Sequence, residues 1–320
     1  MRRTTIWLVT AAALILVGAG GLALAMALSN GDFSQLSTTS YETKTVDITE
    51  QFRDISLRTG EEDVLFVPSA DGACRVVFRV WEKVSCTAAV EDSALRIETQ
   101  DGRSAAEKIS VFSMESPSVT VYLPRADYGA LLMEGSTGDV EMDAEHRFER
   151  AEISAGTGDV NWKASLSGAL RIELSTGDIR LDGISAGELA LSVSTGGVNL
   201  HSVNCRGGIT IGVSTGKASL SNVRCRSLRS AGSTGDIRLE DLIAEEGISV
   251  ERSTGDVELR GCDAAELFIK TSTGDVSGSL LSPKRYVTHS DTGRVEIPES
   301  FDGGKCEIRT TTGNILLRED

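Results

Sequence analysis

The sequence predicts an all-β fold in which one N-terminal transmembrane helix precedes a β-solenoid, a parallel β-helix-like stack of 19–20-residue coils. Two observations predict this class. A Thr-Gly pair recurs ten times at a spacing of 19 or 20 residues, and one uncharged run of 23 residues stands near the N-terminus. A period this strict is typical of architectures that stack one unit on the next. The ten glycines are Gly138, Gly158, Gly177, Gly196, Gly216, Gly235, Gly255, Gly274, Gly293 and Gly313.

The uncharged run from Ile6 to Leu28 is long enough to cross a bilayer as a helix. Arg2 and Arg3 precede it and the first charge beyond it is Asp32, so we expect a single-pass protein of the cell membrane with its N-terminus in the cytoplasm and its C-terminal domain extracytoplasmic. The alternative is a cleaved signal peptide and a secreted protein, because Ala25-Met26-Ala27 resembles a cleavage site. The run is longer than a usual signal-peptide core, which favours the anchor.

The chain divides into four predicted parts. They are the anchor at 1–28, a Ser/Thr-rich tether at 29–45, degenerate coils that cap the stack at 46–130, and the regular ten-repeat solenoid at 131–320. Within the degenerate part, Ile55–Gly60 followed by Asp63–Phe66 looks like one copy with two extra residues in its turn. Terminal units of repeat arrays are generally atypical because they cover an otherwise open core.

Each period reads as two short strands joined at the Thr-Gly turn. In most copies, apolar residues stand two and four positions after the glycine, as at Val160 and Trp162, and seven and five positions before it, as at Leu170 and Ile172. Polar residues alternate with them, so one face of each strand is expected in the core. A chain of hairpins would fit the same alternation, but it would need an open sheet of about twenty strands, which is beyond the usual range. Stacked coils are therefore favoured.

Net charge limits the partners. Beyond the uncharged run, 30 basic residues against 47 acidic ones leave about −17 with neutral histidines. A surface of this sign repels nucleic acid, so we exclude nucleic-acid binding. His146, His201 and His289 fall at three different phases of the repeat and form no row, so they suggest neither a catalytic triad nor a metal site, and no cofactor is expected.

Six cysteines in an exported chain permit disulfides, with fifteen pairings among them. Cys205 and Cys225 each lie nine residues after a repeat glycine, so stacking places them one coil apart. That separation, about 4.8 Å between strands, lies within the range that a disulfide accepts. Cys74 and Cys86 flank an alternating apolar strand and form the second candidate pair.

The residue after the repeat glycine is usually aspartate, and the stacked carboxylates form a candidate Ca²⁺ ladder. Its members are Asp139, Asp159, Asp178, Asp236, Asp256 and Asp275. Carboxylates one coil apart repel one another, and a hard cation would relieve that repulsion. The competing interpretation, which we favour, is that each aspartate caps its own turn and points into solvent.

The Ser-Thr-Gly-Asp-Val copies, preceded by Ser118–Pro124 and by Leu131–Gly135, resemble the bacterial putative-adhesin family, a domain of unknown function. The resemblance covers about residues 46–320. It implies a repetitive β-solenoid on a membrane-anchored or exported protein, and it brings no catalytic residues. The sequence departs from the Asp of the pattern at Gly197, Lys217, Arg294 and Asn314.

These observations predict a non-catalytic, membrane-anchored extracytoplasmic solenoid that acts as an adhesin-like or envelope scaffold. Its expected partners are the membrane, through Ile6–Leu28, and an envelope protein or a glycan. A homo-oligomer through the edge of the C-terminal coil, which ends at Leu317–Asp320, is a further expectation. One alternative is a β-helix enzyme acting on polysaccharide, which would need acidic residues converging on one lateral face. Another is a sensing subunit that binds a second membrane protein.

Overall fold

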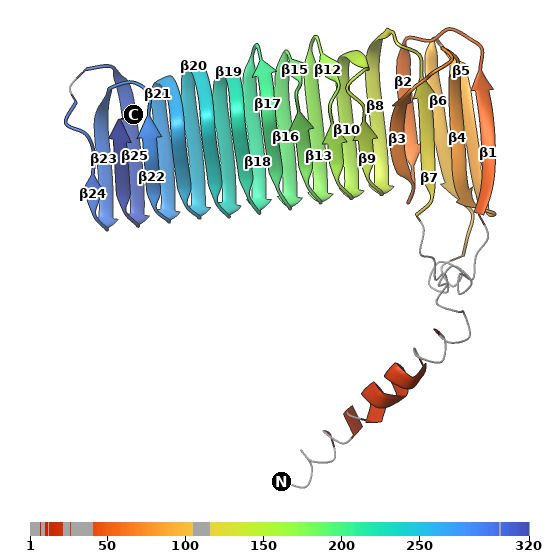
Figure 1. The fold of residues 1–320 in the computed structure, drawn as a ribbon, viewed down its shortest axis with the longest axis horizontal. Coiled ribbons are helices and arrows are strands. Elements are labelled where there is room, and N and C mark those ends of the chain that lie inside the picture. Colours follow the sequence, from red (N-terminus) through yellow and green to blue (C-terminus); the bar gives the residue numbers. More distant parts are fainter. Residues whose placement is uncertain are drawn as a thin grey trace.

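The structure, a computed structural model, is a straight rod of stacked β-coils (Figure 1). It describes Trp7, Thr10, Ala11, residues 13–21, Met26, and residues 41–104, 116–300 and 302–319. Each coil contributes one strand to a wall of long strands and one to a wall of short strands, and the Thr-Gly turns join the two walls along the lower edge of the rod (Figure 1). We call these the long wall and the short wall.

The long wall contains the strands that end at the Thr-Gly turns. From the N-terminal end of the rod its order is β5 (Val84–Glu91), β6 (Ala94–Asp101), β2 (Asp54–Thr59), β8 (Asp127–Thr137), β10 (Arg147–Thr157), β13 (Ala169–Thr176), β16 (Glu188–Thr195), β18 (Gly208–Thr215), the second halves of β19 (Ala218–Thr234), β20 (Ile237–Thr254) and β21 (Val257–Thr273), then β25 (Gly304–Thr312) and β23 (Lys284–Thr292).

The short wall contains the strands that follow the turns. Its order is β1 (Tyr41–Ile48), β4 (Cys74–Trp81), β7 (Ser118–Leu123), β3 (Asp63–Pro68), β9 (Val140–Met142), β11 (Val160–Trp162), β14 (Ile179–Asp182), β17 (Val198–Cys205), the first halves of β19, β20 and β21, then β22 (Val276–Leu280), β26 (Ile315–Glu319) and β24 (Val295–Glu296). At the upper corner two short strands, β12 (Ser165–Leu166) and β15 (Ser185–Ala186), lead back to the long wall.

The coils pair in parallel from β2 to β23 in the long wall and from β7 to β24 in the short wall, which confirms a solenoid rather than a chain of hairpins. The predicted apolar pairs face inward. Val160, Trp162, Leu170 and Ile172 are all at most 1% exposed. Period-two alternation therefore specified which side of each strand is buried.

The repeat glycine occupies a conformation that other residues avoid. At Gly177 φ is +135°, and a Cβ atom there would lie 2.0 Å from the Gly158 carbonyl oxygen of the preceding coil. The backbones of successive turns thus pack directly on one another, and only glycine permits both the φ value and the close approach. This requirement explains why the glycine recurs without exception.

The N-terminal end differs from the predicted series of degenerate coils. The coil of β2 and β3 stacks directly on that of β8 and β9, because the Thr137 N–H donates to the Gly60 carbonyl at 2.8 Å. The intervening strands β4–β7, with β1, extend the two walls outward and cover the core. Arg103 helps to close this end, since its guanidinium lies 3.8 Å from the centre of the Trp81 ring and pairs with Asp101 at 2.7 Å.

The spatial order of coils departs from the sequence order at the other end. The coil of β25 and β26 lies between the coil of β21 and β22 and the coil of β23 and β24. The Gly274 N–H donates to Thr312, and the Gly313 N–H donates to Thr292, both at 2.9 Å. The expectation that the last coil in sequence carries the free edge is therefore wrong. In the described part of the chain that edge belongs to Lys284–Glu296.

The predicted membrane segment Ile6–Leu28 lies only partly within the described residues, of which 13–21 are helical. Among the described residues, no helix combines the length and the hydrophobicity that crossing a membrane requires. Most of the predicted tether, residues 29–40, lies outside the described residues, and its last five residues begin β1.

Candidate functional site

The predicted aspartate ladder is a set of backbone caps. The Asp139 carboxylate accepts the N–H of Asp159 at 2.8 Å, and Asp159 accepts the N–H of Asp178 at the same distance. Each carboxylate therefore fixes the turn of the next coil. The same bond recurs from Asp63 to Asp139, Asp178 to Gly197, Asp236 to Asp256, Asp256 to Asp275, Asp275 to Asn314 and Asn314 to Arg294, with the acceptor named first.

Cations of the protein neutralise part of this ladder. Arg180 bridges Asp159 and Asp178 at 2.7 and 2.5 Å, and its guanidinium lowers the pKa of the Asp159 carboxyl. The hydrogen bond from the Asp256 N–H has the largest effect in lowering the pKa of the Asp236 carboxyl, and the hydrogen bond from Lys217 lowers it further. The structure brings together no group of three or more His, Cys, Asp or Glu side chains that could hold a metal, as far as the described ranges extend. The hydrogen bonds of the ladder therefore correspond to the capping interpretation.

All six cysteines lie in the described part of the chain, and all are buried free thiols. Neither predicted disulfide is formed. Cys205 and Cys225 do occupy neighbouring coils, as predicted, because Asn204 and Arg224 pair in register directly before them. Cys74 and Cys86 do not pair with each other: Cys74, at the start of β4, pairs with Ile48 of β1, whereas Cys86 of β5 pairs with Thr99 of β6.

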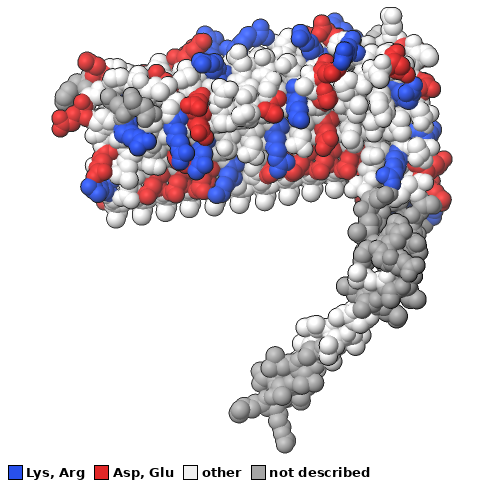
Figure 2. Space-filling view, in the orientation of Figure 1, with Lys and Arg blue, Asp and Glu red and all other residues white. Residues whose placement is uncertain are grey.

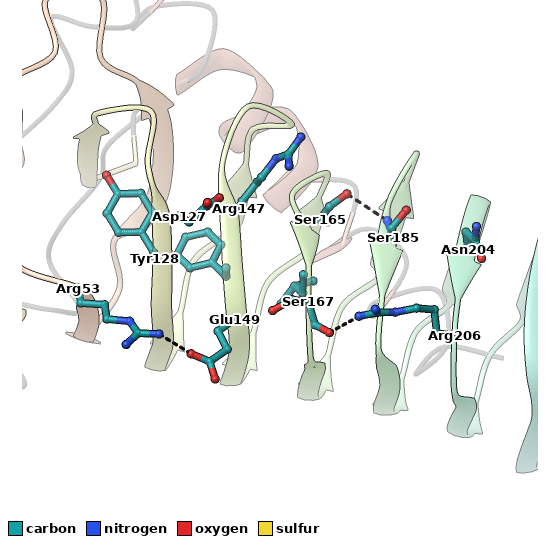
Figure 3. A pocket seen from close by; sticks show the side chains of 12 residues that line it. Arg53, Asp127, Tyr128, Arg147, Glu149, Ser165, Ser167, Ser185, Asn204 and Arg206 are labelled. Carbon is teal, nitrogen blue, oxygen red and sulfur yellow. Dashed lines mark hydrogen bonds and ion pairs between the residues drawn. The ribbon is translucent and has the colours of Figure 1, made fainter.

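A groove of about 780 Å³ lies at the upper corner, near the N-terminal end of the rod (Figure 3). We call it the arginine groove. Its lining residues are Arg53, Asp127, Tyr128, Arg147, Phe148, Glu149, Ser165, Leu166, Ser167, Ser185, Asn204 and Arg206. They come from successive coils, so the groove runs along the rod and across the strands.

A row of polar side chains follows the groove because each stands at the same place in its coil. Arg147 pairs in register with Asp127 on one side and with Ser165 on the other. Ser185 pairs with Asn204, and its N–H donates to the Ser165 hydroxyl at 3.1 Å. Parallel stacking at about 4.8 Å per coil thus converts residues scattered through the sequence into one continuous row.

The opposite rim carries two further guanidinium groups (Figure 3). Arg53 pairs with Glu149 at 2.8 Å, and both side chains are more than half exposed. Arg206 donates to the carbonyl of Ser167. An exposed ion pair of this kind contributes little to stability.

Aromatic rings form a rigid base beneath the row. Phe52, Tyr128, Phe148 and Trp162 stack in sequence with ring centroids 5.5–5.9 Å apart. Tyr128 and Phe148 are 5% and 3% exposed. The Tyr128 hydroxyl donates to the Pro124 carbonyl at 2.7 Å, and burial raises its pKa. The base is fixed by packing, which keeps the polar row above it in place.

Chemically, the arginine groove offers hydrogen-bond donors and cations. Of its two acidic residues, Glu149 is engaged by Arg53, and Asp127 stands next to Arg147 in register. Sequence reasoning did not find this site. The spacings of 18, 20 and 19 residues along Arg147, Ser165, Ser185 and Asn204 nearly repeat the period, but these residues lie outside the apolar pairs that reveal it.

Lateral charges elsewhere pair across neighbouring coils. Arg238 pairs with Glu258 at 2.7 Å, and Arg226 pairs with Glu246 at 2.8 Å. Figure 2 shows acidic side chains along the lower edge of the rod and basic ones interspersed over the visible face. Mixed charge of this kind is expected on any soluble sheet.

The chain is similar to several solved structures. A putative adhesin of Parabacteroides merdae is 12% identical over 77% of this chain and 98% of its own, with a TM-score of 0.48. A putative lipid binding protein of Parabacteroides distasonis is 13% identical over 88% of this chain and 98% of its own, with a TM-score of 0.47. A putative cell adhesion protein of Clostridium sporogenes is 12% identical over 88% of this chain and 100% of its own, with a TM-score of 0.28.

Comparison with curated proteins gives no match. A family profile, in contrast, covers most of the solenoid and its cap, matching residues 52–224 and 221–320. The matched segments contain the coils, the Thr-Gly turns and the arginine groove. The chain belongs to the Toastrack DUF4097 family.

Proposed function

We propose that this protein is a non-catalytic binding scaffold whose ligand lies in the arginine groove. One observation carries the proposal: a row of polar side chains, exposed at all members but the half-buried Ser165, stands on a packed aromatic base, with Arg147 at one end of the row. Binding sites require polar groups held in fixed positions by rigid elements. The row meets this requirement because each of its members is anchored in a hydrogen-bonded coil.

The proposal includes attachment to the membrane. The uncharged run Ile6–Leu28 and the preceding Arg2 and Arg3 support an anchor with the solenoid outside the membrane. Alkaline carbonate extraction of membranes from cells that express the full chain tests this. The protein is expected in the membrane pellet and open to external protease. Recovery of a shortened chain in the medium would establish cleavage instead.

The binding function is tested with the full chain in mild detergent, on a glycan array and in a pull-down from solubilised membranes. The variant Ser185→Trp fills the middle of the groove, where Ser185 is exposed. Its control is Ser227→Trp, which adds the same indole at a second depression on the long wall. Loss of a ligand with the first variant and retention with the second are expected. Ligand capture that survives Ser185→Trp would refute the groove as the binding site, and turnover of a captured glycan would favour the enzyme alternative.

A further inference from the structure

We infer that the ligand of the arginine groove is an acidic polysaccharide, an extended chain of sugar rings bearing carboxylates that lies along the rod. This inference rests on the proposed binding function and names its ligand class. It follows from three properties of the groove. These are the direction of the polar row, the positions of guanidinium groups that form no ion pair, and the backbone N–H groups around them, which are already hydrogen-bonded.

The polar row extends beyond the groove by one coil. Asn204 pairs in register with Arg224 of β19, which is exposed. The row therefore reads Arg147, Ser165, Ser185, Asn204, Arg224, with two hydroxyls and one amide between two arginines. Four steps of about 4.8 Å separate its ends by roughly 19 Å. A ligand that meets the whole row must be a chain that repeats at about the spacing of the coils, as the rings of an extended polysaccharide do.

Both terminal arginines are available for an anion. Neither Arg147 nor Arg224 forms an ion pair with any residue in the described ranges, whereas Arg53 pairs with Glu149 and Arg226 pairs with Glu246. Asp127 is the acidic residue adjacent to Arg147 in register. On a chain with a net charge of −15, unpaired cations at both ends of one polar row mark a site for negative charge. Guanidinium groups match the planar geometry of carboxylates.

The backbone of the groove argues against a peptide that adds a strand. The N–H groups of Ser167, Asn204 and Arg206 donate to carbonyls of neighbouring coils at 2.9–3.0 Å. A peptide that recognises a sheet by strand addition needs an unpaired edge. The groove instead presents side-chain hydroxyl, amide and guanidinium groups, which are the groups that bind sugar hydroxyls and carboxylates. The Tyr128 and Phe148 base supplies an apolar wall beneath them.

The test is calorimetric titration of the full chain with a galacturonate hexamer, the same hexamer with its carboxylates methyl-esterified, and a glycerol-phosphate hexamer. The variant Arg147→Gln/Arg224→Gln removes both ends of the row. Its control, Arg229→Gln/Lys270→Gln, removes the same charge from exposed positions on the long wall. Thermal unfolding of both variants verifies that the fold is retained.

The galacturonate hexamer is expected to bind the wild-type chain and the control within about twofold of each other. The Arg147→Gln/Arg224→Gln variant should bind it about tenfold or more weakly, because each charge-assisted hydrogen bond contributes about that factor. The esterified hexamer should not bind. Equal binding of the ester, preference for the glycerol-phosphate hexamer, or undiminished binding by the double variant would overturn the inference.

Failure of the acidic ligand class can be told apart from failure of the proposed binding function. If a neutral glycan or a membrane protein is captured and Ser185→Trp abolishes its capture, the binding scaffold stands and the acidic ligand class is wrong. If nothing is captured in a manner sensitive to Ser185→Trp, both are wrong.

Discussion

The Asp178 carboxylate accepts the backbone N–H of Gly197 at 2.7 Å, and the cap ladder of the lower edge is interrupted there. Gly197 has no side chain with which to accept the N–H of Lys217 in the next coil. The ladder resumes only at Asp236, whose carboxylate accepts the Asp256 N–H at 3.2 Å. The interruption divides the turns of the rod into two capped series.

Replacement of Gly197 by Asp should join the two series. The new carboxylate is expected to accept the Lys217 N–H and to stabilise the protein by about 1 kcal/mol, the net contribution of a typical hydrogen bond. The measurement is the urea unfolding midpoint. Gly197→Ala is the control, because it changes unfolded-chain entropy in a similar way without adding an acceptor. A Gly197→Asp protein no more stable than Gly197→Ala would contradict the capping role.

Gly196 and Gly197 are adjacent but should respond differently to alanine. Gly196 has a φ of +139°, and a Cβ there would lie 1.9 Å from the Gly177 carbonyl oxygen. Gly197 has no φ in the left-handed region, and its nearest contact would be 3.3 Å. Gly196→Ala is expected to lose about 2 kcal/mol or more, the cost of backbone strain with an added clash. Similar unfolding midpoints for the two variants would show that the turn tolerates a side chain.

His146 should make the protein sensitive to acid. Its ring is 0% exposed and neither nitrogen has a partner among the described residues, and burial lowers its pKa below the usual 6.5. Because the unfolded chain then binds a proton more readily, stability is lost as pH falls below about 6.5, by at most about 1.4 kcal/mol per pH unit. Urea unfolding at pH 7.5 and 5.5 measures this loss.

The variant His146→Leu should lose less stability than wild type over that interval, whereas His201→Gln, at an exposed position, should behave as wild type. An unchanged pH dependence in His146→Leu would assign the acid sensitivity to other groups. Asp159 and Asp236 have lowered pKa values, so their contributions are also lost as pH falls, but only through the acidic range of carboxyls.

Arg252 is a cation inside the core. It is 4% exposed and donates to the Ser230 hydroxyl at 2.9 Å, while its Nε and Nη1 atoms have no partner in the described structure. Burial lowers its pKa. Arg252→Met keeps the volume and removes the buried charge, so we expect a gain of about 1 kcal/mol or more in the free energy of unfolding. Arg252→Ala leaves a cavity, so its free energy of unfolding should be lower than that of Arg252→Met. A less stable Arg252→Met protein would show that the charge is compensated.

The repeat period predicted most of the fold because stacking and burial both depend on local alternation. Val160, Trp162, Leu170 and Ile172 were identified as core residues by their distance from a glycine alone. The distance from a glycine could not predict the order in which the coils stack. Parallel pairing depends on which coils fit against each other in space, and this need not follow their order in the sequence. A signal was present, however, because Tyr286 and Thr288 occupy inward positions where most other copies carry two apolar residues.

The candidate site was less accessible to sequence reasoning. The aspartates were predicted as caps, and the structure adds that each caps the next coil rather than its own. The arginine groove depends on which residues of different coils meet at the upper corner. The row of the groove combines Arg, Ser and Asn, so the residue type changes from coil to coil although the place in the coil stays the same.

The interposed coil has a consequence for biosynthesis. A chain that emerges from the ribosome exposes Lys284–Glu296 before Gly304–Glu319 exists, yet in the described structure the strands of the earlier segment pair with those of the later one. At about 5–20 residues per second, the earlier segment must wait unpaired for one to several seconds. Assembly of the rod therefore cannot proceed strictly from one end to the other, and its outermost coil is completed last although it is not made last.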